Sequence, residues 1–195
     1  MARAFRLKAG RIRGRLDADE LAVVVQVLRS TRDFVAPTQA DTGDPLLDLV
    51  AGMGSEDSAR EAPEDPALLR LLPVAHRTDA AHAQEFRALT EHSLRRRKAS
   101  NLDAAIEALT GQGPGTIELD EAQASSLMVA LTDVRLVLGE RLGLRTDEDS
   151  AALHEALGAA ASGDDAAADV RLQQMAYYDF LSWLQESIAM SLLQK

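Results

Sequence analysis

The 195-residue sequence contains no cysteine and few aromatic side chains. Without cysteine the chain cannot form a disulfide, a thiolate metal site, a cysteine nucleophile or a thiol-based redox switch. Aromatic residues make up only 4% of the chain, and much of its 46% hydrophobic content is Ala and Leu. This balance favours helix over sheet, and the length suits one domain with a substantial core.

Long apolar runs are also missing. Residues Met1 to Arg6 lack the apolar core of about 7 to 15 residues found in signal peptides, and no stretch approaches the ~18 apolar residues of a membrane span. We therefore expect a cytoplasmic protein that has no membrane partner.

Charge is unevenly distributed along the chain. The net charge is −10, yet six of the 21 basic residues precede the first acid, Asp17. Subtracting these six positive charges from the net charge leaves −16 on the rest of the chain. Such a balance repels nucleic acid at long range except where positive charge is concentrated on one face. We expect the two ends of the molecule to prefer different partners.

The hydrophobic pattern predicts a mainly α fold, a helical bundle of about five to seven helices with a short N-terminal β-hairpin. Apolar and basic residues alternate over residues 4–16 on either side of Ala9-Gly10, as in a hairpin. One further short strand is predicted at residues 116–119. The third helix is either continuous or interrupted at residues 100–101. The expected helices span about 18–35, 67–72, 79–110, 121–142, 146–157 and 165–193.

Local signals set the expected boundaries. Asp17 with Glu20, and Asp120 with Gln123, have the spacing of a capping box, and Gly143 predicts a Schellman-type helix stop. After the first helix, proline, small residues and acids dominate the sequence. We therefore interpret the chain as a single domain over residues 1–195 with a flexible acidic insert at about 38–66.

No motif with a catalytic or metal-binding mechanism is found. Asp79 and His82 have the i, i+3 spacing of half a carboxylate-bridged metal site, but no second pair completes it. Gly111, Gly113 and Gly115 precede a strand and lack the Lys and Ser or Thr of a phosphate-binding loop. No Gly-x-Ser-x-Gly elbow is present. We therefore predict a protein that is not an enzyme and has no catalytic, cofactor-binding or metal-binding residue.

Two concentrations of basic residues form the candidate interaction surface. The alternative is a solvated face whose cations pair with nearby acids. Direct nucleic-acid binding is disfavoured because no aromatic or amide base readers accompany the cations on an exposed helix. The candidate residues are Arg6, Arg11, Arg13 and Arg15 in the hairpin and Arg95, Arg96, Arg97 and Lys98 in the third helix.

Four aromatic residues, Tyr177, Tyr178, Phe180 and Trp183, crowd the last predicted helix. Burial in the core is one interpretation, since large rings dominate burial in an aromatic-poor chain. The other is an anchor for a partner or for a homodimer. Adjacent residues leave a helix about 100° apart, so the two tyrosines cannot both face the core.

Motifs built from packing and charged residues occur at 65–77, 85–91, 94–95, 131–143 and 184–187. In these motifs, and over nearly its whole length, the chain resembles the actinobacterial AosR family, formerly described as a domain of unknown function. The resemblance implies a cytoplasmic oxidative-stress regulator that acts through protein contact. It further implies contact with a sigma factor or RNA polymerase and increased expression of cysteine-biosynthesis genes.

The family's oxidant sensor is a closely spaced cysteine pair, which this chain lacks, so the resemblance carries over the scaffold without the sensor. Asp133, Arg135 and Arg141 match the family pattern, and we expect them at an interaction surface or in an ion pair between helices. Our hypothesis is a non-enzymatic regulatory protein that acts by protein–protein contact. The alternative is a small-ligand-binding or enzymatic protein with a site between helices.

Overall fold

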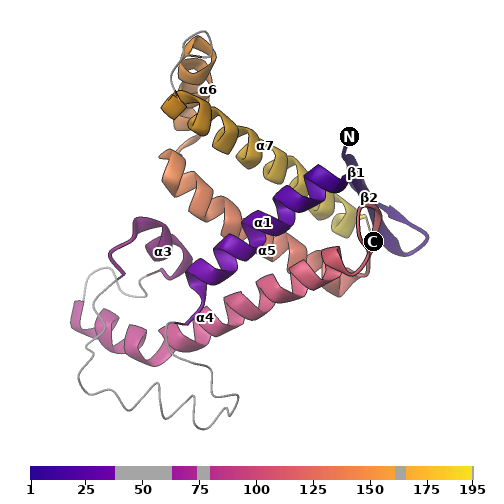
Figure 1. Cartoon of the computed structure of the whole chain (residues 1–195). Helices are drawn as coiled ribbons and strands as arrows, with labels where there is room; N and C mark the ends of the chain where they lie inside the picture. Colours follow the sequence, from indigo (N-terminus) through magenta and orange to yellow (C-terminus); the bar gives the residue numbers. More distant parts are fainter. Residues whose placement is uncertain (38–62, 74–79, 161–165, 195) are drawn as a thin grey trace.

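The computed structural model describes residues 1–37, 63–73, 80–160 and 166–194. These residues form six helices and three strands, which confirms the predicted mainly helical fold (Figure 1). None of these helices is long and apolar enough to cross a membrane. The elements are β1 (Arg3–Lys8), β2 (Arg11–Leu16), α1 (Ala18–Val35), α3 (Pro66–Leu71), α4 (Ala80–Thr110), β3 (Gly115–Leu119), α5 (Glu121–Leu142), α6 (Asp147–Ala160) and α7 (Ala166–Leu193).

The predicted hairpin forms around a two-residue turn. Ala9 and Gly10 both have positive φ, 51° and 76°, as a type I′ turn requires. The predicted third strand, β3, adds to the other side of β2, so a three-stranded antiparallel sheet has the order β1-β2-β3. Residues from the start and the middle of the chain therefore share one sheet.

Side chains close both edges of this sheet. On the β3 edge, the Gln112 amide accepts a bond from the Glu118 backbone amide at 2.8 Å and donates to the Glu118 carbonyl at 2.9 Å. On the β1 edge, Ser187 Oγ accepts from the Phe5 amide at 3.1 Å and Ser191 Oγ donates to the Phe5 carbonyl at 2.9 Å. These bonds occupy backbone groups that would otherwise pair with another strand.

The predicted helix boundaries are confirmed by their caps. Asp17 with Glu20, and Asp120 with Gln123, form capping boxes at the start of α1 and α5. Gly143 ends α5 in the left-handed conformation, with the Leu144 amide bonded to the Gly139 carbonyl at 2.7 Å, as in a Schellman motif. The sequence therefore determined where these two helices begin and where α5 ends.

Helix α4 runs without a break through residues 100–101, so the alternative of an interrupted helix is not formed. The Asn101 side chain donates to the Ser126 carbonyl on α5 at 3.1 Å, so it joins two helices and leaves its own helix intact. Residues 38–62, which make up most of the expected insert, and Asp79 lie outside the described residues.

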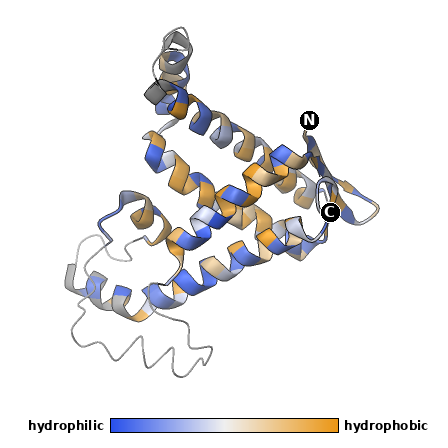
Figure 2. Ribbon diagram, viewed as in Figure 1, coloured by the Kyte–Doolittle hydropathy of each residue, from blue (hydrophilic) through white to orange (hydrophobic). Residues whose placement is uncertain are grey.

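Helix α5 is central to the core. It packs against α1, α3, α4 and α7, and Figure 2 shows apolar residues concentrated where α1 crosses it. Its predicted apolar stripe is buried at Leu127, Leu131 and Val134 and partly buried at Leu138 and Leu142. Each fully buried side chain of this size stabilises the fold by about 1.5–3 kcal/mol.

The aromatic residues of α7 serve several roles. Phe180 packs against the core and stacks on Trp183, whose side chain is 39% exposed. Tyr178 lies beneath the Arg135 guanidinium, 5.1 Å from its ring centre, whereas Tyr177 accepts a bond from Gln173 on its own helix. The two tyrosines thus point to different neighbours, as expected, and the cluster is only partly core.

Helix α6 is attached to α7 by an exposed pair. His154 Nε2 lies 2.9 Å from Asp179 Oδ2, and His154 Nδ1 lies 2.8 Å from the Ser150 carbonyl. Thr146 and Asp149 cap the start of α6 through reciprocal bonds, as the sequence predicted. The helix continues to Ala160, slightly beyond its expected end.

Replacing Ala9 with Asn is expected to stabilise the protein. Left-handed backbone costs an ordinary L-residue about 1–2 kcal/mol, and Asn tolerates it better than Ala. Ala9→Asn should therefore raise the melting temperature in thermal unfolding. Ala9→Val, which places a branched side chain at the same φ, should lower it. Equal melting temperatures for the three proteins would contradict the turn geometry.

The attachment of α6 to α7 is expected to depend on pH. The hydrogen bond with Asp179, and then that with the Ser150 carbonyl, raise the pKa of His154 above its ordinary value. The stabilisation is therefore complete below the unfolded pKa of about 6.5 and is lost as pH rises through the higher folded-state pKa. Hydrogen-exchange protection factors of α6 amides should fall over this window. His154→Gln should abolish the pH dependence, and its persistence in that variant would exclude the pair as its cause.

Candidate functional site

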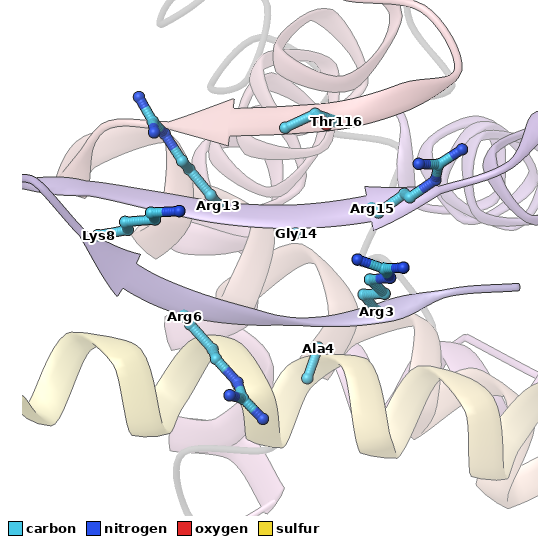
Figure 3. A pocket seen from close by; sticks show the side chains of 8 residues that line it. All are labelled: Arg3, Ala4, Arg6, Lys8, Arg13, Gly14, Arg15 and Thr116. Atoms are coloured by element: carbon cyan, nitrogen blue, oxygen red, sulfur yellow. The ribbon is translucent and has the colours of Figure 1, made fainter.

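Strand alternation gives the sheet one apolar face and one basic face. In β2, Ile12, Gly14 and Leu16 are buried, while the intervening arginines lie on the opposite face. Across the β1–β2 pair, basic residues lie opposite basic residues. We call this surface the cationic face (Figure 3). It consists of Arg3, Arg6, Lys8, Arg11, Arg13 and Arg15.

A β-bulge places Arg3 on this face. Arg3 pairs with Arg15 and Arg6 pairs with Arg13, so the register shifts by one residue between them. The extra residue reverses the alternation, and two arginines three positions apart point the same way. The candidate residues chosen from the sequence included Arg6 but neither Arg3 nor Lys8. The uneven spacing of basic residues in β1 was the signal for this bulge.

Gly14 and Phe5 hold the cationic face against α7. A Cβ atom at Gly14 would lie 2.8 Å from the Phe5 ring, so only glycine lets the ring pack there. Phe5 is 2% exposed, and its backbone amide and carbonyl bond to Ser187 and Ser191 of α7. The cationic face is therefore attached rigidly to the helical core.

Like charges face each other directly across the hairpin. Arg3 pairs with Arg15, Arg6 with Arg13, and Lys8 with Arg11. Directly opposed like charges destabilise a sheet, by roughly the 0.2–1 kcal/mol that opposite charges contribute. Three such pairs in one short hairpin are a cost that core packing does not explain.

Carboxylates neutralise only part of the cationic face. Arg13 donates from Nη2 to Glu118 Oε2 at 3.2 Å, and Arg11 Nη1 lies 3.9 Å from Asp120 Oδ2. The other four cations form no ion pair within the described part of the chain; these are Arg3, Arg6, Lys8 and Arg15. All cations of the face except Arg11 line an open depression of about 530 Å³, together with Ala4, Gly14 and Thr116 (Figure 3).

The second basic run is divided by its helix. Arg95 and Lys98 point toward neighbouring helices, whereas Arg96 and Arg97 are exposed. Arg95 Nε donates to Glu91 Oε1 at 2.8 Å, and Lys98 Nζ donates to Asp133 Oδ1 at 2.6 Å. Arg95 and Lys98 therefore follow the alternative in which the cations pair with nearby acids. Residues 95–98 lie in the middle of α4, whereas the hairpin lies near the C-terminal end of this helix, so the two basic groups do not form one continuous surface (Figure 1).

A family model matches residues 2–192, nearly the whole chain. The chain belongs to the DUF2017 family, a domain of unknown function. No curated protein and no solved structure matches it. Because the family description assigns no activity, the functional argument for this DUF2017 chain rests on its own residues.

The residues Asp133, Arg135 and Arg141 do not form one cluster. Asp133 bonds to Lys98 of α4, whereas Arg135 donates to Gln185 Oε1 of α7 at 2.6 Å. Arg141 pairs with Asp65, the N-cap of α3, and lies over the Phe34 ring at 5.7 Å. Each side chain thus fastens α5 to a different neighbour, which agrees with the expected ion-pair role for Asp133 and Arg141.

Histidine is the commonest metal ligand in proteins. Among the described residues, no three His, Asp or Glu side chains come together as ligands. His82 lies on α4, and its sequence partner Asp79 is outside the described residues. The cationic face is therefore the candidate site that the structure supports best.

Adjacent cations of α4 should respond very differently to substitution. Lys98 is 20% exposed and its partner Asp133 only 4%, and Asp133 Oδ2 is buried without another partner. Lys98→Met should lower the free energy of unfolding by at least about 2 kcal/mol, because it leaves a buried carboxylate unpaired. Arg97→Met, on the exposed side, should change it by less than about 0.5 kcal/mol. Urea unfolding measures both, and similar losses would contradict the division of the run.

Proposed function

We propose that this protein is a non-enzymatic cytoplasmic protein that acts by binding another protein through the cationic face. The observation that carries the proposal is a set of six directly opposed cations on a chain whose remaining charge is −16. Their mutual repulsion opposes folding of the free protein and would be relieved by an acidic partner. The arrangement therefore favours binding over a purely structural role.

A protein partner fits this surface better than nucleic acid. The residues that the three strands present on this face are basic apart from Ala4, Thr116 and Glu118, with no aromatic ring for base stacking and no amide for reading base edges. The strongly acidic remainder of the molecule would repel a long polyanion that extends beyond the sheet. An acidic patch on a folded protein can match the size of the face without this repulsion.

The family resemblance supports a more specific proposal. A regulator that contacts a sigma factor or RNA polymerase needs a rigid recognition surface, and the cationic face meets that need because it is anchored to α7. Without cysteine, the chain would serve as the binding scaffold of an oxidative-stress response and not as its thiol sensor.

The depression of about 530 Å³ favours one alternative, a small anionic ligand held on the same face. Its volume lies within the range of small-molecule sites, although it is open to solvent. A thermal-shift screen of anionic metabolites distinguishes the two functions. A ligand at 100 times its dissociation constant should stabilise the protein by about 2.7 kcal/mol.

Charge reversal on the cationic face should abolish partner binding. The test variant is Arg6→Glu/Lys8→Glu, and the matched control is Arg29→Glu/Arg171→Glu, which makes the same change at exposed helical positions outside the candidate interaction surface. In crosslinking pull-downs from an actinobacterial lysate, the wild-type protein and the control should retain sigma factor or polymerase, whereas the test variant should lose it.

Circular dichroism of both double variants checks that the fold is intact. The proposed function is rejected if the pull-down recovers no partner that depends on the cationic face for its retention. Retention that is equal in the test variant and in the control would reject it as well.

A further inference from the structure

The basic residues of the cationic face lie in three rows across the sheet, and the rows differ in their acids. Arg6 and Arg13 form one row, which ends at Glu118. Lys8 and Arg11 form the second row, and Asp120 lies near Arg11. The row formed by Arg3, Arg15 and Thr116 ends in a neutral hydroxyl. We call this third set the Arg3 row. It is the row with two guanidinium groups and no carboxylate.

We propose that the Arg3 row binds a phosphomonoester group carried by the protein partner. This inference rests on the proposed function, because it names the chemical group that the cationic face recognises. The three side chains come from three neighbouring strands, spaced about 4.7–4.9 Å apart. All three are exposed and line the depression, and Figure 3 shows them toward one end of it, away from Lys8 and Arg13.

Charge favours a phosphomonoester over a carboxylate. Two arginines carry two positive charges, and a phosphomonoester carries about −1.5 to −2 at neutral pH. One carboxylate would leave the row with an excess positive charge. Two guanidinium forks and a hydroxyl also supply enough donors for three phosphoryl oxygens, whereas a carboxylate offers only two oxygens.

The acids that follow β2 do not replace such a ligand. Asp17 Oδ1 accepts a bond from the Glu20 amide at 3.0 Å, and its Oδ2 lies 2.9 Å from the Met1 amino group. Glu20 accepts from the backbone amides of Asp17 and Ala2. Both carboxylates are committed to the start of α1 and to the first residues of the chain, and no ion pair joins either of them to Arg3 or Arg15.

Charge also separates a phosphomonoester from a nucleic-acid backbone. A phosphodiester carries a single negative charge, so it would not neutralise the Arg3 row. A backbone would also have to continue across rows that already contain Glu118 and Asp120. A single dianionic group at the end of the face fits the observed distribution of acids better than a chain of monoanions.

A set of three acidic peptides tests the proposal. They share one sequence of Asp, Glu and Gly residues and differ at a central position, which is phosphoserine, glutamate or serine. Binding to the full-length protein is measured by isothermal titration calorimetry. Arginine Nε–H resonances are followed by NMR, so that the contacted side chains are identified. We expect the phosphoserine peptide to bind at least about tenfold more tightly than the glutamate peptide, with shifts at Arg3 and Arg15.

Matched variants locate this preference. Arg15→Gln should remove the tenfold preference, Arg15→Lys should retain only part of it, and Thr116→Val should weaken it. Arg13→Gln removes the same charge from a row that contains Glu118, and it should keep the preference. Because Arg15→Gln also removes an opposed like charge, its melting temperature should equal or exceed that of the wild-type protein, so lost binding would not reflect unfolding.

The outcomes separate this inference from the proposed function. Equal binding of the phosphoserine and glutamate peptides would overturn the phosphomonoester site and leave an acidic protein partner in place. An equal loss of the phosphoserine preference in Arg13→Gln and Arg15→Gln would do the same. Binding of none of the peptides at low salt would count against both. Tighter binding of an oligonucleotide without terminal phosphates would overturn both in favour of nucleic acid. Phenyl phosphate that binds as tightly as the phosphopeptide would replace the protein source with a small ligand.

Discussion

Burial of helix α5 is the constraint on which the rest of this structure depends. Its residues Leu127, Leu131 and Val134 are almost fully buried, and the helix packs against α1, α3, α4 and α7. Because one helix supplies an interface to four others, its rotation about its own axis fixes the directions of its polar side chains as well. Lys98 can then reach Asp133 on one side, while Arg135 reaches Gln185 on another.

The same packing explains why the basic residues of the chain take different roles. A helix turns each successive side chain by about 100°, so a run of four cations cannot remain on one surface. Arg95 and Lys98 are directed into the packed helices and pair with buried acids. A strand alternates its side chains, so the spaced cations of the hairpin gather on one face, with a bulge bringing Arg3 into line.

The cationic face is supported by the core but does not contribute to it. Gly14 allows the Phe5 ring to lie beneath the sheet, and serines of α7 hold the backbone of Phe5. The strands that carry the opposed cations are therefore held against α7 and cannot easily move apart to reduce the repulsion. The backbone of this surface is preorganised, so little backbone entropy would be lost on binding.

Local chemistry in the sequence determined the helical class, the two capping boxes, the Schellman stop after Gly143 and the turn at Ala9-Gly10. Each of these depends on residues within a few positions of one another, where hydrogen-bonding geometry follows from spacing. The lack of cysteine likewise excluded thiol chemistry without reference to a fold.

Only the tertiary structure decided which charges remain available. The pairing of β3 with β2, the partners Lys98–Asp133 and Arg141–Asp65, and the position of Glu118 beside Arg13 all join residues that are distant in sequence. Such contacts depend on how the buried faces of the helices and the sheet pack together, which residue spacing along the chain does not encode. The acid-free Arg3 row therefore became visible only when three strands were placed side by side.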